Sequence, residues 1–163
     1  MAKNFVFDAQ SYLDELEQMQ DAIVPICKMG LYDGARAALD AVLAEIDDIP
    51  DRRYTNSGMA RGLTKSDKED LRAGLGISRM RDVDGQVSVK IGFDGYGSHS
   101  TPTWPNGVPV AMIARAICRG TSWLEKYDFV SKAIRKSRAR IESGIANRID
   151  IQIQKTIQGA KNK

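Results

Sequence analysis

The sequence is poor in the side chains and segments on which several large classes of protein depend. Aromatic residues make up only 7% of its 163 residues, too few for the stacking platforms that bind single-stranded nucleic acid. It has no run of about 18 apolar residues, the minimum for a membrane-spanning helix, and its first residues lack the apolar core of a secretion signal. We therefore expect no membrane partner, and a chain that works where it is made or where an assembly carries it.

Two cysteines and one histidine leave little material for metal binding or nucleophilic catalysis. Cys27 and Cys118 stand far apart, each in an apolar helical pattern, so no zinc-ligand spacing occurs. We predict free thiols that pack as small hydrophobic groups, while a disulfide between them stays open. His99 lies in a Gly/Ser-rich loop, where a catalytic triad would need an orienting acid such as Asp94. We expect His99 to be a solvated loop residue.

The remaining short motifs also lack the partners that their chemistry requires. Asp82-Val83-Asp84-Gly85 is similar to the start of a calcium loop, but strand-like residues follow it and the downstream glutamate is missing. Gly92, Gly95 and Gly97 precede no strand-to-helix turn of the dinucleotide-binding type. The sequence thus indicates a protein that is not an enzyme and that holds no cofactor and no metal.

What the sequence does contain is a pronounced charge polarity. Residues 1–51 carry three basic and eleven acidic side chains (−8), residues 52–125 eleven and seven (+4), and residues 126–163 ten and three (+7). An acidic beginning and a basic end can neutralise each other within one fold or between neighbouring copies. The length, with 42% hydrophobic and 28% charged residues, indicates one globular domain over residues 1–163.

The acidic region, residues 1–50, has the apolar periodicity of helices. One helix is predicted from Asp8 to Lys28, where Pro25 kinks it or ends it early, with Gly30 as a plausible stop. A second helix is predicted from Asp33 to about Asp47. The two segments form either a helical hairpin or one broken helix.

The middle of the chain, residues 66–120, combines a short helix, a hairpin and a capped helix. Ser66 to Glu69 matches a capping box, which predicts a helix that begins there and fails at Gly74 or Gly76. Alternating apolar residues up to Phe93, around the turn at Asp84-Gly85, predict a β-hairpin. Polar loops precede and follow these elements at residues 52–65 and 94–107. A further helix is predicted to start at Pro109 and to stop at Gly120.

Residues 123–158 predict a long basic helix. An apolar stripe begins at Phe129 and continues to Ile153, although Gly144 and the alternating "IDIQIQ" segment leave a terminal strand open. A turn at residues 120–122 would let this helix pack back across the hairpin. The expected fold class is therefore α+β, with a small antiparallel β-sheet, centred on the hairpin, packed against N-terminal helices and a long basic C-terminal helix.

Three short segments in this order resemble the tail-completion or neck family of long-tailed bacteriophages, the minor tail proteins of the lambda tail protein Z group. The first is "DKEDLRAGLGI" before the hairpin, which matches the family at Leu71, Arg72 and Leu75. The second is "MIARAICRGTS" at the end of a helix, which matches at Ala114, Gly120, Thr121 and Ser122. The third is "YDFVSKA", which keeps Phe129 and Ala133 in comparable positions. The resemblance covers about residues 64–135.

The resemblance implies a structural virion protein at the head–tail junction that forms a homo-oligomeric ring and joins the tail to the DNA-filled head. Its implied partners are head connector or head-closure proteins and tail-terminator or tail-tube proteins, with non-specific contact to genome DNA as a further option. Assembly would take place in the host cytoplasm. A closed ring needs two different surfaces of each copy, which the acidic beginning and basic end of the chain could supply.

Two other functions stay open at this point. One is a tail-terminator ring subunit in the same particle. The other is a basic nucleic-acid-binding module, because clustered Lys and Arg neutralise phosphates whatever the base sequence. The candidate residues for assembly or for facing DNA are Arg119, Gly120, Thr121, Trp123, Lys132, Arg135, Lys136, Arg138 and Arg140.

Overall fold

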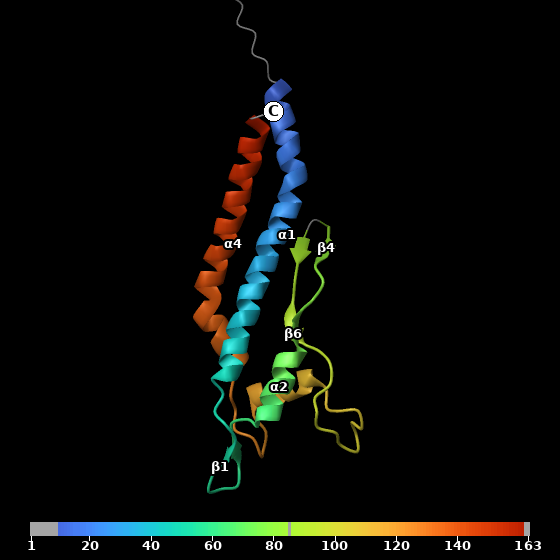
Figure 1. Ribbon diagram of the computed structural model, residues 1–163, viewed down its shortest axis with the longest axis vertical. Helices are drawn as coiled ribbons and strands as arrows, with labels where there is room; N and C mark the ends of the chain where they lie inside the picture. Colours follow the sequence, from blue (N-terminus) through green and yellow to red (C-terminus); the bar gives the residue numbers. More distant parts are fainter. Residues whose placement is uncertain (1–9, 85, 162–163) are drawn as a thin grey trace, which may run out of the picture.

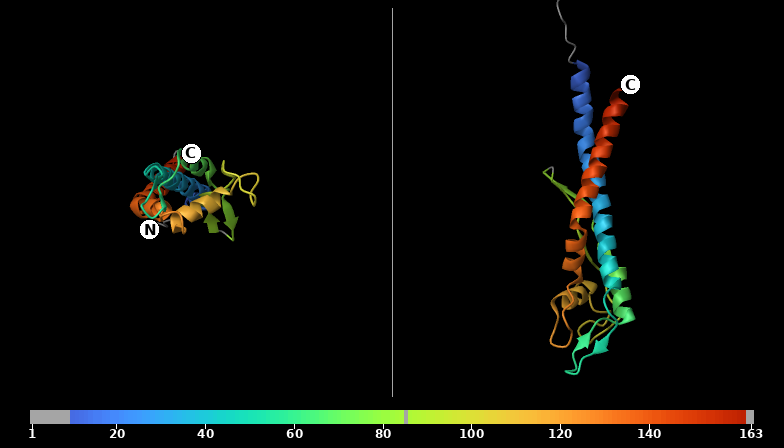
Figure 2. Two further views of the ribbon diagram at one scale, coloured as in Figure 1. Left: turned by 90° about the horizontal axis from the view of Figure 1, so that it is seen from below. Right: turned by 90° about the vertical axis from the view of Figure 1, so that its left-hand side faces the viewer.

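Two long antiparallel helices run side by side through most of the molecule, and the smaller elements gather toward one end of the pair (Figure 1 and Figure 2). The computed structural model describes residues 10–84 and 86–161. The long helices are α1 (Gln10–Asp47) and α4 (Phe129–Lys161), and the short ones are α2 (Lys65–Gly74) and α3 (Val110–Arg119). With small antiparallel sheets of two strands each, the predicted α+β class is confirmed.

The acidic region forms one continuous helix, so the predicted stop at Gly30 is wrong. Pro25 lies inside α1, and the predicted start, Asp8, lies outside the described residues. Gly30 and Gly34 are buried against α4: a Cβ on Gly30 would come within 2.9 Å of Ile149 Cγ1, and one on Gly34 would collide with Ile145. These glycines serve close helix packing, whose gain outweighs their weak helix propensity.

The basic region is likewise one helix, which decides the alternative that the sequence left open. α4 continues through Gly144 and through the "IDIQIQ" segment to Lys161. It lies along α1, on the side away from the hairpin in the view of Figure 1, and not back across the hairpin as expected. The reason is the close packing of these two helices, in which Gly30 and Gly34 of α1 leave room for Ile149 and Ile145 of α4.

The N-cap of α2 lies two residues before the predicted one, Ser66. The N-cap is Thr64, whose hydroxyl accepts a hydrogen bond from the Asp67 backbone N–H at 3.1 Å, while the Asp67 carboxylate accepts one from the Thr64 N–H at 3.1 Å. Ser66 and Glu69 have the same spacing, but Asp67 is buried and also binds Arg52. This tertiary contact selects the register of the cap. The helix ends at Gly74, as predicted.

The predicted hairpin is confirmed, in two sections. Its base pairs β3 (Leu75–Ile77) with β6 (Ile91–Phe93), and its outer part pairs β4 (Arg81–Val83) with β5 (Gln86–Ser88). Three residues separate the sections on the first side and two on the second, so a bulge breaks the ladder. Gly85 of the predicted turn lies outside the described residues. A further small pair, β1 (Arg53–Tyr54) with β2 (Ala60–Arg61), lies within the predicted polar loop.

The core lies where α1 ends and the short helices meet the start of α4. Phe129, Ile46 and Leu71 are completely buried there, and the Phe93 ring from the hairpin meets the Phe129 ring edge-on at 6.0 Å. α3 ends at Gly120 as predicted, with a φ of +75° that favours glycine. This core holds the segment after α3 in a fixed position against β2.

Candidate interaction surfaces

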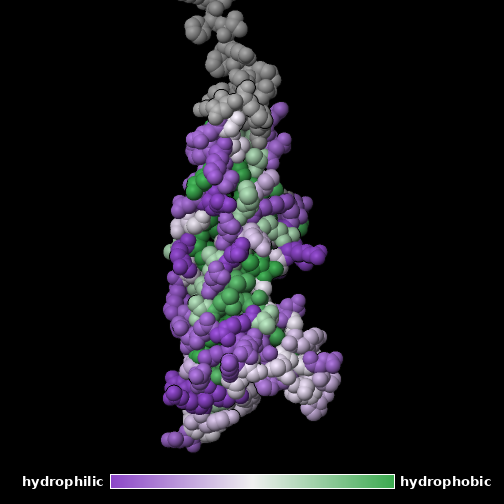
Figure 3. Space-filling view, in the orientation of Figure 1, coloured by the Kyte–Doolittle hydropathy of each residue, from purple (hydrophilic) through white to green (hydrophobic). Residues whose placement is uncertain are grey.

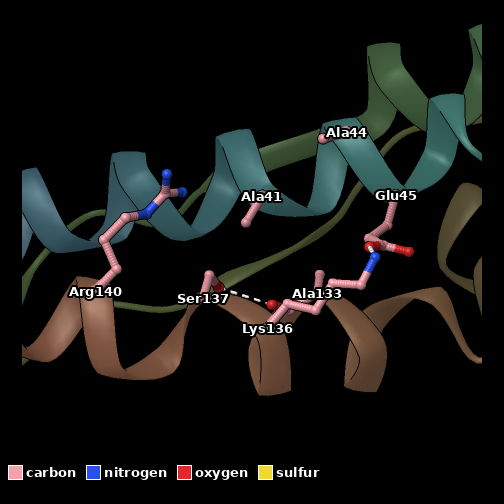
Figure 4. Close-up of a pocket in the computed structure, with 7 residues that line it drawn as sticks. All are labelled: Ala41, Ala44, Glu45, Ala133, Lys136, Ser137 and Arg140. Atoms are coloured by element: carbon pink, nitrogen blue, oxygen red, sulfur yellow. Dashed lines mark hydrogen bonds and ion pairs between the residues drawn. The ribbon is translucent and has the colours of Figure 1, made fainter.

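The basic start of α4 meets an acidic residue of α1 within the same chain. Lys132 Nζ and Lys136 Nζ lie 2.9 Å and 2.5 Å from the two carboxylate oxygens of Glu45, and Figure 4 shows Lys136 reaching from α4 to Glu45. Farther along the pair, Arg148 Nε lies 3.1 Å from Asp33 Oδ2. Part of the charge polarity in the sequence is thus neutralised inside one fold.

The surroundings of the Glu45 carboxylate favour its charged form. Burial by itself would raise the pKa of Glu45, but hydrogen bonds from Lys136 and Lys132 outweigh it and hold this pKa below its usual value. The hydrogen bond to Glu45 also raises the pKa of Lys132, as does a second one to the Tyr127 hydroxyl. Lys132 and Lys136 therefore tie α4 to α1, and they are poorly placed to bind a partner.

The other predicted basic residues of α4 are more available. Arg138 pairs with Glu142 on its own helix at 2.7 Å. Arg135 and Arg140 are exposed and form no ion pair with the residues that the structure describes. Of the five predicted basic residues on α4, two thus tie this helix to α1, one pairs within α4 and two remain for a partner.

The predicted residues after α3 form a tight turn that presents an aromatic side chain. Gly120 N–H donates to the Ala116 carbonyl at 2.8 Å, and the Thr121 hydroxyl accepts from the Leu124 N–H at 3.0 Å. Trp123, between them, is 57% exposed, although its carbonyl accepts from the Ala60 N–H. Gly120 and Thr121 therefore have a structural role, and Arg119 and Trp123 remain surface residues.

Trp123 borders a cavity of about 420 Å³, hereafter the α3 cavity. It lies between α3, the N-terminal end of α2, the loop at residues 99–101 and the segment at 121–124. Most of its wall is apolar and includes Leu63, Val108, Met112, Ala116, Ile117 and Leu124. Met112 is 49% exposed and the Trp123 side chain also reaches solvent, so the cavity opens toward the surface between them.

One end of the α3 cavity is polar, and the sequence did not indicate this. Arg52 Nη2 lies 2.7 Å from Asp67 Oδ2, and His99 Nε2 lies 3.4 Å from Asp67 Oδ1. His99 is thus held beside an acid, although its side chain is 57% exposed; the suggested acid, Asp94, instead accepts from the Gly95 N–H. The Nε of Arg52 is buried and has no hydrogen-bond partner among the described residues.

Nothing in the local sequence connects these three residues, which lie on different segments. The loop that carries His99 is attached to α2 by the Ser98 N–H and hydroxyl, both of which donate to Asp70. The result is a mostly apolar compartment with the polar residues Arg52, Asp67 and His99 at one end. Such a compartment suits a mostly apolar group that carries a polar atom.

Further apolar side chains are exposed away from this cavity. On α1 these are Ile23, Val24, Met29 and Tyr32, and on the hairpin Val83 is 62% exposed. Figure 3 shows hydrophobic surface along the middle of the helical pair, beside the base of the hairpin. The molecule therefore presents apolar groups in more than one region.

Cys27 and Cys118 are both free and half-buried, so the predicted thiols are confirmed and the disulfide is absent. Burial raises the pKa of the Cys118 thiol. Among the described residues, no helix has both the length and the apolar character needed to cross a bilayer, and no three metal-ligating side chains lie together. Comparisons with protein-family models, with curated proteins and with solved structures gave no match.

Proposed function

We propose that this chain is a structural virion protein at the phage head–tail junction, a neck or tail-completion subunit that assembles as a ring and joins the tail to the DNA-filled head. One structural observation carries the assembly part: large apolar side chains stay exposed in separate regions, around Met112 and Trp123 and again at Val83 and on α1. Contiguous exposed apolar surface marks sites of association. The assignment to the head–tail junction rests on the short motifs from Leu71 to Ala133.

Separate surfaces suit a ring. In a closed ring each copy uses one surface toward the preceding copy and a different one toward the next. The α3 cavity and the hairpin are different surfaces of one chain, whereas the ion pairs of Glu45 are made inside the chain. The ring contact is therefore better sought at the cavity and the hairpin than in a meeting of the acidic and basic ends.

Electron microscopy of particles that lack this protein tests the proposal. A neck subunit predicts full heads and finished tails that fail to join, together with rings of the purified protein that restore joining. Overlong tails would assign the chain to the tail-terminator ring instead. Normal infectious particles would contradict both assignments.

A basic nucleic-acid-binding module is the second candidate, and Arg135 and Arg140 favour it because both are exposed and lack a carboxylate partner among the described residues. Phosphate contacts make affinity fall steeply with salt. Monomer binding to duplex DNA that weakens steeply as salt rises, and that is lost in an Arg135→Gln/Arg140→Gln variant, would support this candidate. Assembly of that variant into normal rings would show that the two roles are separate.

A further inference from the structure

The outer part of the hairpin projects from the helical pair as an arm, formed by β4 and β5 (Figure 2). Asp82 faces α1, where its carboxylate lies 2.9 Å from Lys28 Nζ. Because successive side chains of a strand point to opposite faces, Val83 faces away from α1, and it is 62% exposed. The arm thus presents Val83 next to Asp84 near its tip, while the charge of Asp82 is paired with Lys28.

The arm cannot reach the α3 cavity of its own chain. The Asp82–Lys28 ion pair places the arm beside the middle of α1, whereas the cavity lies next to α2, which is tied to the end of α1 by the Arg72–Asp47 ion pair. From Lys28 to Asp47 the helix rises by about 28 Å. A contact between arm and cavity therefore requires two copies of the chain.

The charges around the cavity match those of the arm. Arg115 follows Met112 by three residues and Arg119 follows Ala116 by three, so that both exposed arginines border the α3 wall of the cavity. The wall of the cavity itself is mostly apolar. An occupant with an acidic group beside an apolar one would therefore suit this combination of apolar wall and neighbouring arginines.

The aromatic side chain with the highest exposed fraction, Tyr54, fits less well. Tyr54 is 72% exposed, but Arg53 precedes it and its strand pairs with Arg61. Bringing these cations to a rim that already carries Arg115 and Arg119 would be repulsive. Asp84, next to Val83, makes the arm the better partner.

We infer that the end of β4 on the hairpin arm, with Val83 and Asp84, inserts into the α3 cavity of a neighbouring copy and forms the ring contact. The cavity, at about 420 Å³, is in the size range that accepts whole ligands, so several atoms of the tip can enter together with Val83. Since the contact joins two different surfaces, each copy can both give an arm and receive one. The inference rests on the proposed ring.

Disulfide trapping in the full chain tests the contact directly. In a Cys27→Ala/Cys118→Ala background, Val83→Cys together with Met112→Cys should yield covalent oligomers on mild oxidation. Val83→Cys with Ile134→Cys is the matched control, because Ile134 (51%) and Met112 (49%) are equally exposed but Ile134 lies on α4. The control pair should give no more crosslinks than Val83→Cys alone.

Val83→Asp provides a second readout that does not depend on cysteine chemistry. A buried carboxylate in the apolar cavity is unfavourable, so self-association measured by sedimentation velocity should weaken at least tenfold. The melting temperature of the monomer should stay within a few degrees, because residue 83 is exposed in the single chain.

The outcomes separate the contact from the proposed function. Oligomers that form without preferential Val83–Met112 crosslinking, or that are indifferent to Val83→Asp, would overturn the arm contact and leave the ring standing. A chain that stays monomeric at every concentration and gives no crosslink would also overturn it. The role at the head–tail junction is decided independently, by the particles that lack the protein.

Discussion

Glu45 shows how much one buried carboxylate contributes to the contact between the two long helices. Its side chain is 5% exposed and receives an ammonium group from each of Lys132 and Lys136. Neither lysine is near Glu45 in sequence, and both pairs reach from α4 to α1. The side chain therefore acts between elements and not within one.

We expect Glu45→Gln to destabilise the protein by roughly 1 kcal/mol, because the charge-assisted hydrogen bond from Lys136 and the ion pair with Lys132 are weakened, while both lysines keep access to water. Urea denaturation measures the change. Glu142→Gln is the control: its partner Arg138 is on the same helix and both side chains are mostly exposed, so its effect should lie within about 0.5 kcal/mol. Equal effects for the two variants would contradict the role assigned to Glu45.

The same residue predicts a dependence of stability on pH. Because the folded state lowers the pKa of Glu45, its contribution is fully present above about pH 4.3, the pKa of an unperturbed glutamate, and is lost as the pH falls through the lower folded value. The difference in unfolding free energy between the native chain and Glu45→Gln should therefore shrink in acid. A difference that stays constant from pH 6 to pH 3 would exclude this linkage.

Gly34 and Gly144 offer a matched pair, since both lie inside long helices but only one has a close neighbour. A Cβ on Gly34 would collide with Ile145, while nothing lies within 4 Å of a Cβ on Gly144. We expect Gly34→Ala to destabilise by about 1–3 kcal/mol through overpacking, and Gly144→Ala to stabilise by roughly 0.5–1 kcal/mol through helix propensity. Thermal unfolding distinguishes the signs, and a stabilising Gly34→Ala would contradict close packing there.

At the scale of elements, α1 illustrates how a helix tolerates an unfavourable residue. Pro25 has no N–H to donate and is exposed on the helix surface. The helix continues because the residues that follow Pro25 pack against other elements, beginning with the buried Ile26. Helix formation here is decided by tertiary packing and not by local propensity.

Replacement of this proline should stabilise α1. Pro25→Ala restores a backbone hydrogen bond and removes a steric clash, for an expected gain of about 1–3 kcal/mol, measured by chemical denaturation and by helical content. Val24→Ala, at the neighbouring exposed position, should change stability by no more than about 0.5 kcal/mol. A loss of stability in Pro25→Ala would mean that the fold requires the bend that proline imposes.

The hairpin shows which element properties follow from local sequence. The alternating residues Val87, Val89, Ile91 and Phe93 are half-buried, whereas Ser88, Lys90 and Gly92 between them are exposed. The sequence pattern does not predict the bulge. The alternating residues lie on the second side of the hairpin, whereas the extra residue lies on the first, among residues 78–80. A bulge changes the direction of a strand, so this one affects the angle between the base of the hairpin and the arm.

At the scale of the whole molecule, the long helical pair makes the protein elongated. α1 has 38 residues, equivalent to about 57 Å of helix, whereas a compact domain of this length would have a radius of gyration near 15 Å. Solution X-ray scattering of the monomer should therefore give a maximum dimension above about 57 Å and a radius of gyration well above 15 Å. A value near 15 Å would contradict the arrangement of α1 and α4.

The sequence by itself determined the features that depend on neighbouring residues: the helical stripes, the hairpin around Asp84 and the C-cap of α3 at Gly120. Tertiary structure decided the features that depend on remote ones. Gly30 became a packing residue because Ile149 lies against it, Thr64 became the cap because Asp67 also binds Arg52, and His99 gained an acid from another segment. Local sequence patterns indicate the spacing of apolar residues and the residues that favour turns. Whether a glycine ends a helix or allows another helix to pack closely depends on the residues that lie against it.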